Sequence, residues 1–189
     1  MQVALLLIDV QGEYFPPGGQ WQVPNGAIAL VQIQSLLAVA RTVRLPIFHI
    51  VHESLDSAAS VFRPGTPGVE IHSEIRPLHG EDIIRKHFPG SFTQTPLEAY
   101  LRRAGADTLI VCGFMTHVCC DTTTRQARER GFSVWFAADA TATRDLALGD
   151  RAIGHATIQE AVLAIMGHFA SVLPAAEIIR RIQGGAGNG

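Results

Sequence analysis

The chain has 189 residues, of which 47% are apolar and 17% are charged, and its formal net charge is -2. This length and apolar fraction are sufficient for one domain with a substantial core. The small net charge provides no basic field, so we expect no nucleic-acid partner and predict a small-molecule partner. No apolar run approaches the roughly 18 residues that span a bilayer, and the first residues lack a positively charged signal-peptide start, so we expect no membrane association.

Three cysteines, Cys112, Cys119 and Cys120, lie close together without forming a CxxC pair. An odd number of cysteines with no framework spacing is typical of free thiols in a reducing compartment. The sequence therefore predicts a cytoplasmic protein.

Short strand-like runs alternate with segments of helical spacing along the chain. The first run, VALLLI, is too short for an ordinary helix and is typical of a parallel strand buried on both faces. The predicted strands are residues 3–8, 47–51, 82–84, 108–111, 132–136 and 171–173. The predicted helices are residues 26–44, 95–103, 116–130, 150–168 and 175–182.

This alternation forces parallel strand pairing through right-handed crossovers. We therefore predict a three-layer α/β/α, doubly wound fold with a mostly parallel sheet of about six strands in a Rossmann-like order. Residues 1–183 are expected to form one domain and residues 184–189 a flexible tail. Residues 54–80, rich in proline and glycine, are predicted to form a long loop, and loops of that length are usually functional.

Open parallel sheets bind ligands beyond the carboxyl ends of their strands. Polar residues occur at several of these predicted ends: Asp9 after the first strand, His52 after the second, Lys86 after the third and Cys119 after the fourth. We expect these side chains to converge on one crevice.

Cys119 is the candidate nucleophile. If Thr116 caps the following helix, Cys119 lies in its first turn, where free amides and the helix dipole favour a thiolate. The alternative is a cysteine that packs as a small hydrophobe. That alternative is our prediction for Cys112, which lies inside a strand, and Cys120 is expected to point away from the site.

Asp9 and Lys86 are candidates for activating that thiol. A carboxylate at a buried sheet edge can accept the thiol proton, although an aspartate after a strand also commonly caps a turn. Lys86 is the only lysine in the chain, and its ammonium would stabilise a thiolate if it were not a surface residue.

Three stretches carry a family resemblance: LLLIDVQGEYF (5–15), PGTPGVEIHSEIRPLHGEDIIRKHFPGSF (64–92) and IVCGFMTHVCCDTTTRQARERGFSVWFAADA (110–140). They resemble the isochorismatase-like cysteine hydrolases, which include nicotinamidases and carbamoyl amidases. The resemblance covers nearly the whole chain in the same order.

The resemblance implies a catalytic triad of Asp9, Lys86 and Cys119. It also implies a cis peptide bond between Phe114 and Met115, with the amides of Met115 and Cys119 forming an oxyanion hole. For true isochorismatases the resemblance would imply hydrolysis of a vinyl ether without a cysteine nucleophile. Because this sequence has Cys119, we expect hydrolysis of an amide or another non-peptide C–N bond. We also expect a homo-oligomer, either a dimer or a tetramer.

The sequence departs from the family pattern at two places. Cys120 replaces the usual valine, which we expect to be a tolerated packing change. The Asp-x-His metal motif of nicotinamidases is absent, so we predict no metal and no cofactor. Zinc binding by His49 and His52 with Glu53, or by histidines of the 54–80 loop such as His72 and His79, remains the alternative.

Gln11, Phe15 and Phe92 flank the catalytic candidates and are predicted to contact substrate, although core packing is an equal possibility for the two phenylalanines. Phe62 and Trp21 are expected to contribute to specificity. A non-catalytic binding or interaction module that keeps the hydrolase fold is the alternative function. A redox sensor is disfavoured, because a disulfide between adjacent cysteines is strained.

Overall fold

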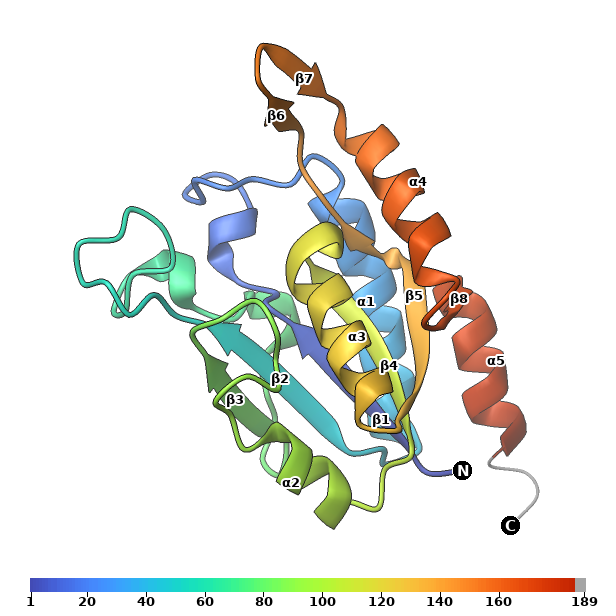
Figure 1. Ribbon diagram of the computed structural model, residues 1–189. Helices are drawn as coiled ribbons and strands as arrows, with labels where there is room; N and C mark the ends of the chain where they lie inside the picture. Colours follow the sequence, from blue (N-terminus) through green and yellow to red (C-terminus); the bar gives the residue numbers. More distant parts are fainter. Residues whose placement is uncertain (186–189) are drawn as a thin grey trace.

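The computed structural model describes residues 1–185 of the chain, folded around a six-stranded sheet of order β3-β2-β1-β4-β5-β8 (Figure 1). Every neighbouring pair in this sheet is parallel. Its strands are β1 (Val3–Ile8), β2 (Ile47–His52), β3 (Asp82–Lys86), β4 (Thr108–Phe114), β5 (Ser133–Ala142) and β8 (Ser171–Leu173). With β8 as the sixth strand, this is the order of doubly wound folds, as predicted.

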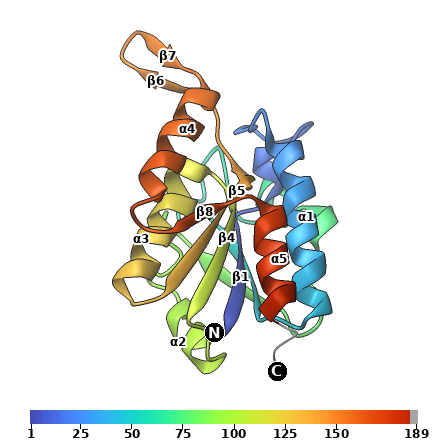
Figure 2. The same ribbon diagram turned by 90° about the vertical axis from the view of Figure 1, so that its right-hand side faces the viewer.

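Helices cover both faces of the sheet, which gives three layers (Figure 2). Helices α1 and α5 pack on one face, and α2, α3 and α4 lie on the other. Their bounds are α1 (Gly26–Thr42), α2 (Leu97–Arg103), α3 (Asp121–Glu129), α4 (His155–Met166) and α5 (Ala175–Gly185). The α/β/α fold class predicted from the sequence is confirmed.

Strand β1 lies at the centre of the sheet because its six residues are all apolar and all buried. Alternate side chains enter the two different core clusters, with Leu5 and Leu7 on the α1 side and Leu6 and Ile8 on the α3 side. A continuous apolar run therefore supplies core side chains to both faces of the sheet. This centrality brings the residue after β1 to the middle of the sheet edge.

Several element boundaries differ from the predictions. Strands β4 and β5 continue to Phe114 and Ala142, beyond their predicted ends at 111 and 136. A two-stranded hairpin, β6 (Leu146–Leu148) and β7 (Arg151–Ile153), was not predicted and projects from the body beside α4 (Figure 1). Helix α5 continues to Gly185, and the rest of the predicted tail lies outside the described residues.

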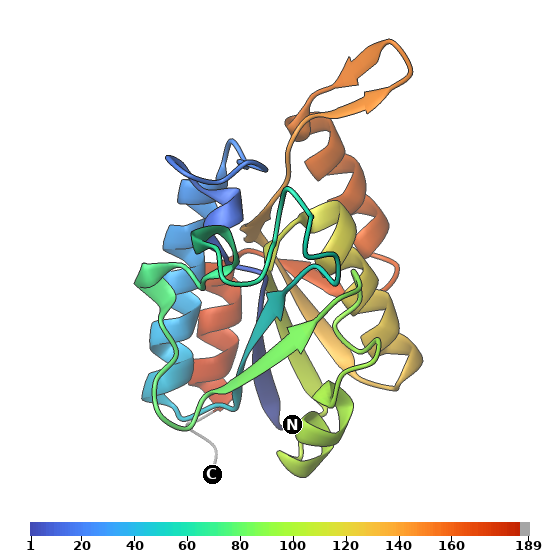
Figure 3. The ribbon, with the colours of Figure 1, turned by 90° about the vertical axis from the view of Figure 1, so that its left-hand side faces the viewer.

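The predicted loop between β2 and β3 contains two short 3-10 turns, η2 (Pro67–Val69) and η3 (Ser73–Ile75). Figure 3 shows this segment crossing above the end of the sheet before it descends past α1 to β3. The loop is tied to the segment after β1, because the Gly12 amide donates to the Glu70 carbonyl at 2.9 Å. Within residues 1–185, no helix combines the length and apolar character needed to cross a membrane.

Candidate active site

Asp9 occupies the end of β1 in a backbone conformation that few residues adopt. Its φ angle is 50°, in the left-handed region that aspartate tolerates better than most side chains. Its amide donates to the Ile50 carbonyl at 2.9 Å, and its side chain is completely buried. The chain therefore turns at Asp9 with the carboxylate held inside the protein.

Gly113, near the end of β4, permits the close approach of β4 to β1 beside Asp9. Gly113 is paired with Ile8 and has a φ angle of 119°, and an added Cβ would lie 2.0 Å from the Ile8 carbonyl oxygen. Only glycine fits this position. The close contact fixes the turn that follows β4 relative to Asp9.

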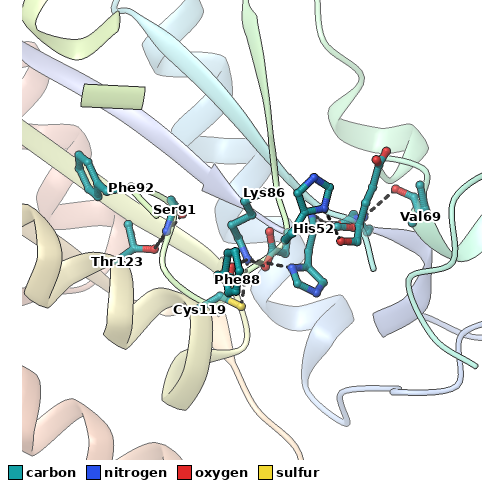
Figure 4. Close-up of polar contacts among 12 residues, drawn as sticks. His52, Val69, Lys86, Phe88, Ser91, Phe92, Cys119 and Thr123 are labelled. Atoms are coloured by element: carbon teal, nitrogen blue, oxygen red, sulfur yellow. Dashed lines mark hydrogen bonds and ion pairs between the residues drawn. The ribbon is translucent and has the colours of Figure 1, made fainter. Parts of the chain in front are cut away.

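Lys86 is the last residue of β3, which runs two residues beyond its predicted end. Its side chain is fully buried, and Nζ lies 2.8 Å from Asp9 Oδ2. Nζ also donates to Cys119 Sγ at 3.3 Å and to the Phe88 carbonyl at 3.1 Å. Figure 4 shows Lys86 reaching toward the sulfur of Cys119, with His52 beside it. The structure thus brings the three predicted triad residues together.

Cys119 lies in a π-helical turn, η4 (Thr116–Cys120), which leads directly into α3. The prediction that Thr116 caps the helix is wrong, because its buried Oγ1 has no hydrogen-bond partner among the described residues and the cap position is Met115. The Val118 and Cys120 amides instead donate to the Met115 carbonyl, at 3.1 and 3.2 Å. Such π-helical turns are frequent at functional sites.

The charges around Cys119 oppose one another. Burial, followed by the Asp9 carboxylate, raises the pKa of the Cys119 thiol, and the Lys86 ammonium partly offsets this effect. Burial also acts to lower the pKa of Lys86, but Asp9 and Cys119 outweigh it and hold that pKa above its ordinary value. At neutral pH the site therefore contains a protonated thiol beside a lysine cation. Asp9 Oδ1 has no hydrogen-bond partner within residues 1–185, so it is available to accept a proton.

The turn between β4 and Cys119 contains the expected cis peptide bond between Phe114 and Met115. The Met115 and Cys119 amides, the predicted oxyanion-hole donors, belong to this same turn. Both residues line the cavity described below.

The other two thiols are buried and free. Burial raises the pKa of Cys112, as expected for a cysteine inside a strand. Burial and the nearby Cys119 raise the pKa of Cys120. Neither residue lines the cavity next to Cys119.

A cavity of about 380 Å³ opens beside Cys119, and we call it the Cys119 pocket. Its size suits a small molecule. Its walls combine aromatic, aliphatic and a few polar side chains, among them Tyr14, Trp21, Phe62, His52, His117, Arg144, Leu146, Met115 and Cys119.

The three predicted substrate contacts do not line this pocket. Both groups of the Gln11 side-chain amide bind the backbone. Its Nε2 donates to the carbonyls of His52 and Val69, and its Oε1 accepts from the backbone N–H of His52. Phe15 lines a different cavity of about 470 Å³ and packs against the Phe114 ring. Phe92 packs on Phe132 in the core. All three residues hold the scaffold around the site.

Trp21 and Phe62, which were expected to influence specificity, do line the pocket, whereas Tyr14, His117 and Arg144 were not predicted. Arg144 was missed because it follows β5, whose predicted end fell six residues too early. Its position just beyond a strand is the signal that would have identified it.

Three of the four histidines considered as metal ligands have other partners, and His72 Nδ1 accepts a hydrogen bond from the Glu74 amide at 3.3 Å. His49 Nε2 lies 2.8 Å from Glu81 Oε2, and Glu81 also pairs with Arg41. His52 Nδ1 is 3.4 Å from Lys86 Nζ, so its nearest polar neighbour is a cation. In the part of the chain that the structure describes, no group of three or more His, Cys, Asp or Glu side chains could hold a metal ion.

Comparisons with known proteins agree with this geometry. The isochorismatase domain model matches residues 3–169. The uncharacterized isochorismatase family protein YddQ of Bacillus subtilis is 39% identical over 173 residues, covering 91% of this chain and 96% of YddQ. Nicotinamidase 3 of Arabidopsis thaliana is 31% identical over 152 residues, covering 74% of this chain and 73% of that protein.

A crystal structure of a cysteine hydrolase from Pseudomonas syringae superposes with a TM-score of 0.91 at 30% identity. The match covers 97% of this chain and 93% of that one. Fold, site geometry and sequence similarity lead to the same result: this chain belongs to the isochorismatase family of hydrolases.

Proposed function

We propose that this protein hydrolyses an amide or another non-peptide C–N bond of a small molecule through a thioester on Cys119. The observation that carries the proposal is the buried Lys86 ammonium, which lies 2.8 Å from Asp9 and 3.3 Å from Cys119, a residue that lines the Cys119 pocket. Proteins similar to this chain support the same chemistry, since one is named a cysteine hydrolase and another a nicotinamidase.

In the first half-reaction, Asp9 takes the proton from Cys119 Sγ, and Lys86 stabilises the thiolate that forms. The thiolate adds to the substrate carbonyl carbon, and the oxygen becomes negative against the amides of Met115 and Cys119. The C–N bond then breaks, and the leaving nitrogen takes the proton that Asp9 holds. The products of this step are ammonia or an amine and a thioester.

In the second half-reaction, Asp9 removes a proton from water, which attacks the thioester carbonyl carbon. The C–S bond breaks, the acid is released, and the proton on Asp9 returns to the sulfur. One water molecule is consumed for each C–N bond cleaved. A raised thiol pKa fits this scheme, because the nucleophile then forms only when Asp9 accepts the proton.

The test is ammonia release from a panel of small primary amides, carbamoyl compounds and ureides. Cys119→Ala should lose activity by at least about 1,000-fold because the nucleophile is removed. Cys120→Val, the matched control in the same turn, should stay close to the wild-type rate, because Cys120 does not line the Cys119 pocket and valine adds only one heavy atom. Wild-type turnover in Cys119→Ala, or loss of activity only in Cys120→Val, would identify a different nucleophile.

The same panel distinguishes the alternative function. A binding or interaction module would bind a panel compound without releasing ammonia, and alkylation of Cys119 would change no reaction rate. The enzyme should instead lose activity in proportion to the fraction of Cys119 alkylated. The three free cysteines further support the proposal that the protein works in a reducing, cytoplasmic compartment.

A further inference from the structure

Arg144 lines the Cys119 pocket with hydrogen-bonding capacity that the protein does not use. It lies two residues after the end of β5 and is partly buried. Its Nε is buried and has no hydrogen-bond partner among residues 1–185. No ion pair of the described residues includes it either. An arginine stays charged in a protein and donates in a planar fork, so an unpaired one at a cavity wall is suited to bind an anion.

The surroundings of Arg144 hold it in place without neutralising it. Its Cζ lies 4.7 Å from the centre of the Trp21 ring, a cation–π arrangement. Tyr14 is near enough for the Arg144 charge to act on its hydroxyl. An aromatic face positions a guanidinium but does not replace a counterion.

The charges of the site leave the pocket positive. Lys86 and Asp9 compensate each other as a buried ion pair. Burial and the adjacent cation lower the pKa of both His52, beside Lys86, and His117, beside Arg144. At neutral pH neither ring adds charge, so the uncompensated charge of the pocket is that of Arg144.

We propose that the Cys119 pocket is selective for amides that also carry a carboxylate, and that Arg144 binds this carboxylate while the amide carbonyl lies at Cys119. This inference rests on the proposed hydrolase function and names its substrate class. A carboxylate matches the guanidinium in planar geometry and carries the single negative charge that balances it. A phosphate would bring nearly two charges to one arginine.

Matched pairs of probe molecules isolate the contribution of the carboxylate to binding. Malonamate, succinamate and glutaramate each carry one carboxylate and one amide, and malonamide, succinamide and glutaramide replace the carboxylate by a neutral group of similar shape. Binding is measured by calorimetry in the Cys119→Ala protein, so that no turnover is needed. At least one anion should bind about 10-fold to 100-fold tighter than its diamide, as expected for a hydrogen-bonded charge pair.

Arg144→Gln in the same background should reduce that preference to less than about twofold, while Arg144→Lys should keep part of it. Arg151→Gln is the matched control, because Arg151 is exposed on β7 and does not line the pocket. The inference is overturned if no anion is preferred, if Arg144→Gln weakens both members of a pair equally, or if Arg151→Gln has the same effect. Ammonia release by the wild type tests the proposed function separately, so a binding preference without turnover would reject only the hydrolase.

Discussion

The Lys86 ammonium has a double role in the proposed site, because it touches both the base and the nucleophile. A buried ion pair is weak evidence for stability, since desolvation offsets most of its attraction. Here the pair Lys86–Asp9 also lies within hydrogen-bond reach of Cys119 Sγ. The arrangement is better explained by control of the thiol proton than by stabilisation of the fold.

Replacing Lys86 tests this role. Lys86→Met removes the cation that lowers the pKa of Cys119, so this pKa should rise further and alkylation by iodoacetamide at neutral pH should slow. Lys86→Arg keeps the charge, but its broad planar group does not fit a fully buried space built for a compact ammonium, so activity should fall as well. The measurement is the rate of alkylation at Cys119 against pH in the three proteins.

Circular dichroism controls for folding in this experiment, because removing one partner of a buried ion pair commonly destabilises a protein by about 3 to 5 kcal/mol. In a folded Lys86→Met protein, an alkylation profile identical to that of the wild type would mean that the ammonium does not stabilise the thiolate. Asp9 and Cys119 would then have to act without it.

At the scale of elements, the predictions are most accurate where side chains alone determine the structure. The apolar run of β1 predicts its bounds at Val3 and Ile8. The end of β5, with the sequence AADATA, contains alanine and aspartate, which have little strand preference. That strand continues because its backbone pairs with β4, as in the pair Gly113 and Thr141, and single-sequence patterns do not show such pairing.

Gly113 offers a prediction about the pairing of β4 with β1. Gly113→Ala would place a methyl group against the Ile8 carbonyl and force a positive φ on alanine, so we expect a loss of roughly 2 kcal/mol or more in the free energy of unfolding. Activity should fall too, since the turn that carries Cys119 follows directly. Urea unfolding monitored by circular dichroism gives the stability.

Gly154→Ala is the control for this substitution. Gly154 precedes α4 with a φ angle of -66°, and no atom lies within 4 Å of an added Cβ. Its unfolding free energy should stay within about 0.5 kcal/mol of wild type. Equal stability of the two variants would mean that β1 and β4 separate at Gly113 without cost, contrary to the tight approach described above.

At the scale of the whole molecule, the catalytic candidates were predictable because each lies just after or at the end of a strand of one parallel sheet. The fold class alone brings Asp9, Lys86 and Cys119 to the same edge. The pocket walls were less predictable, because Trp21, Phe62 and Arg144 come from three separate connecting segments. Their convergence depends on backbone contacts between segments far apart in the sequence, such as the Gly12 amide donating to the Glu70 carbonyl, which no local pattern indicates.

Metal dependence can be tested directly, because the Asp-x-His metal motif of nicotinamidases is absent from this sequence. The candidate ligands at the end of β2 are already engaged: His49 binds Glu81, Glu53 pairs with Arg85 at 3.1 Å, and His52 lies next to the Lys86 cation. A divalent ion at His52 would be repelled by that ammonium. We therefore expect that dialysis against a strong chelator leaves the rate of ammonia release and the rate of Cys119 alkylation unchanged. Elemental analysis of the purified protein should find well below one metal ion per chain, and recovery of a chelator-inactivated sample on addition of zinc would contradict the metal-free mechanism.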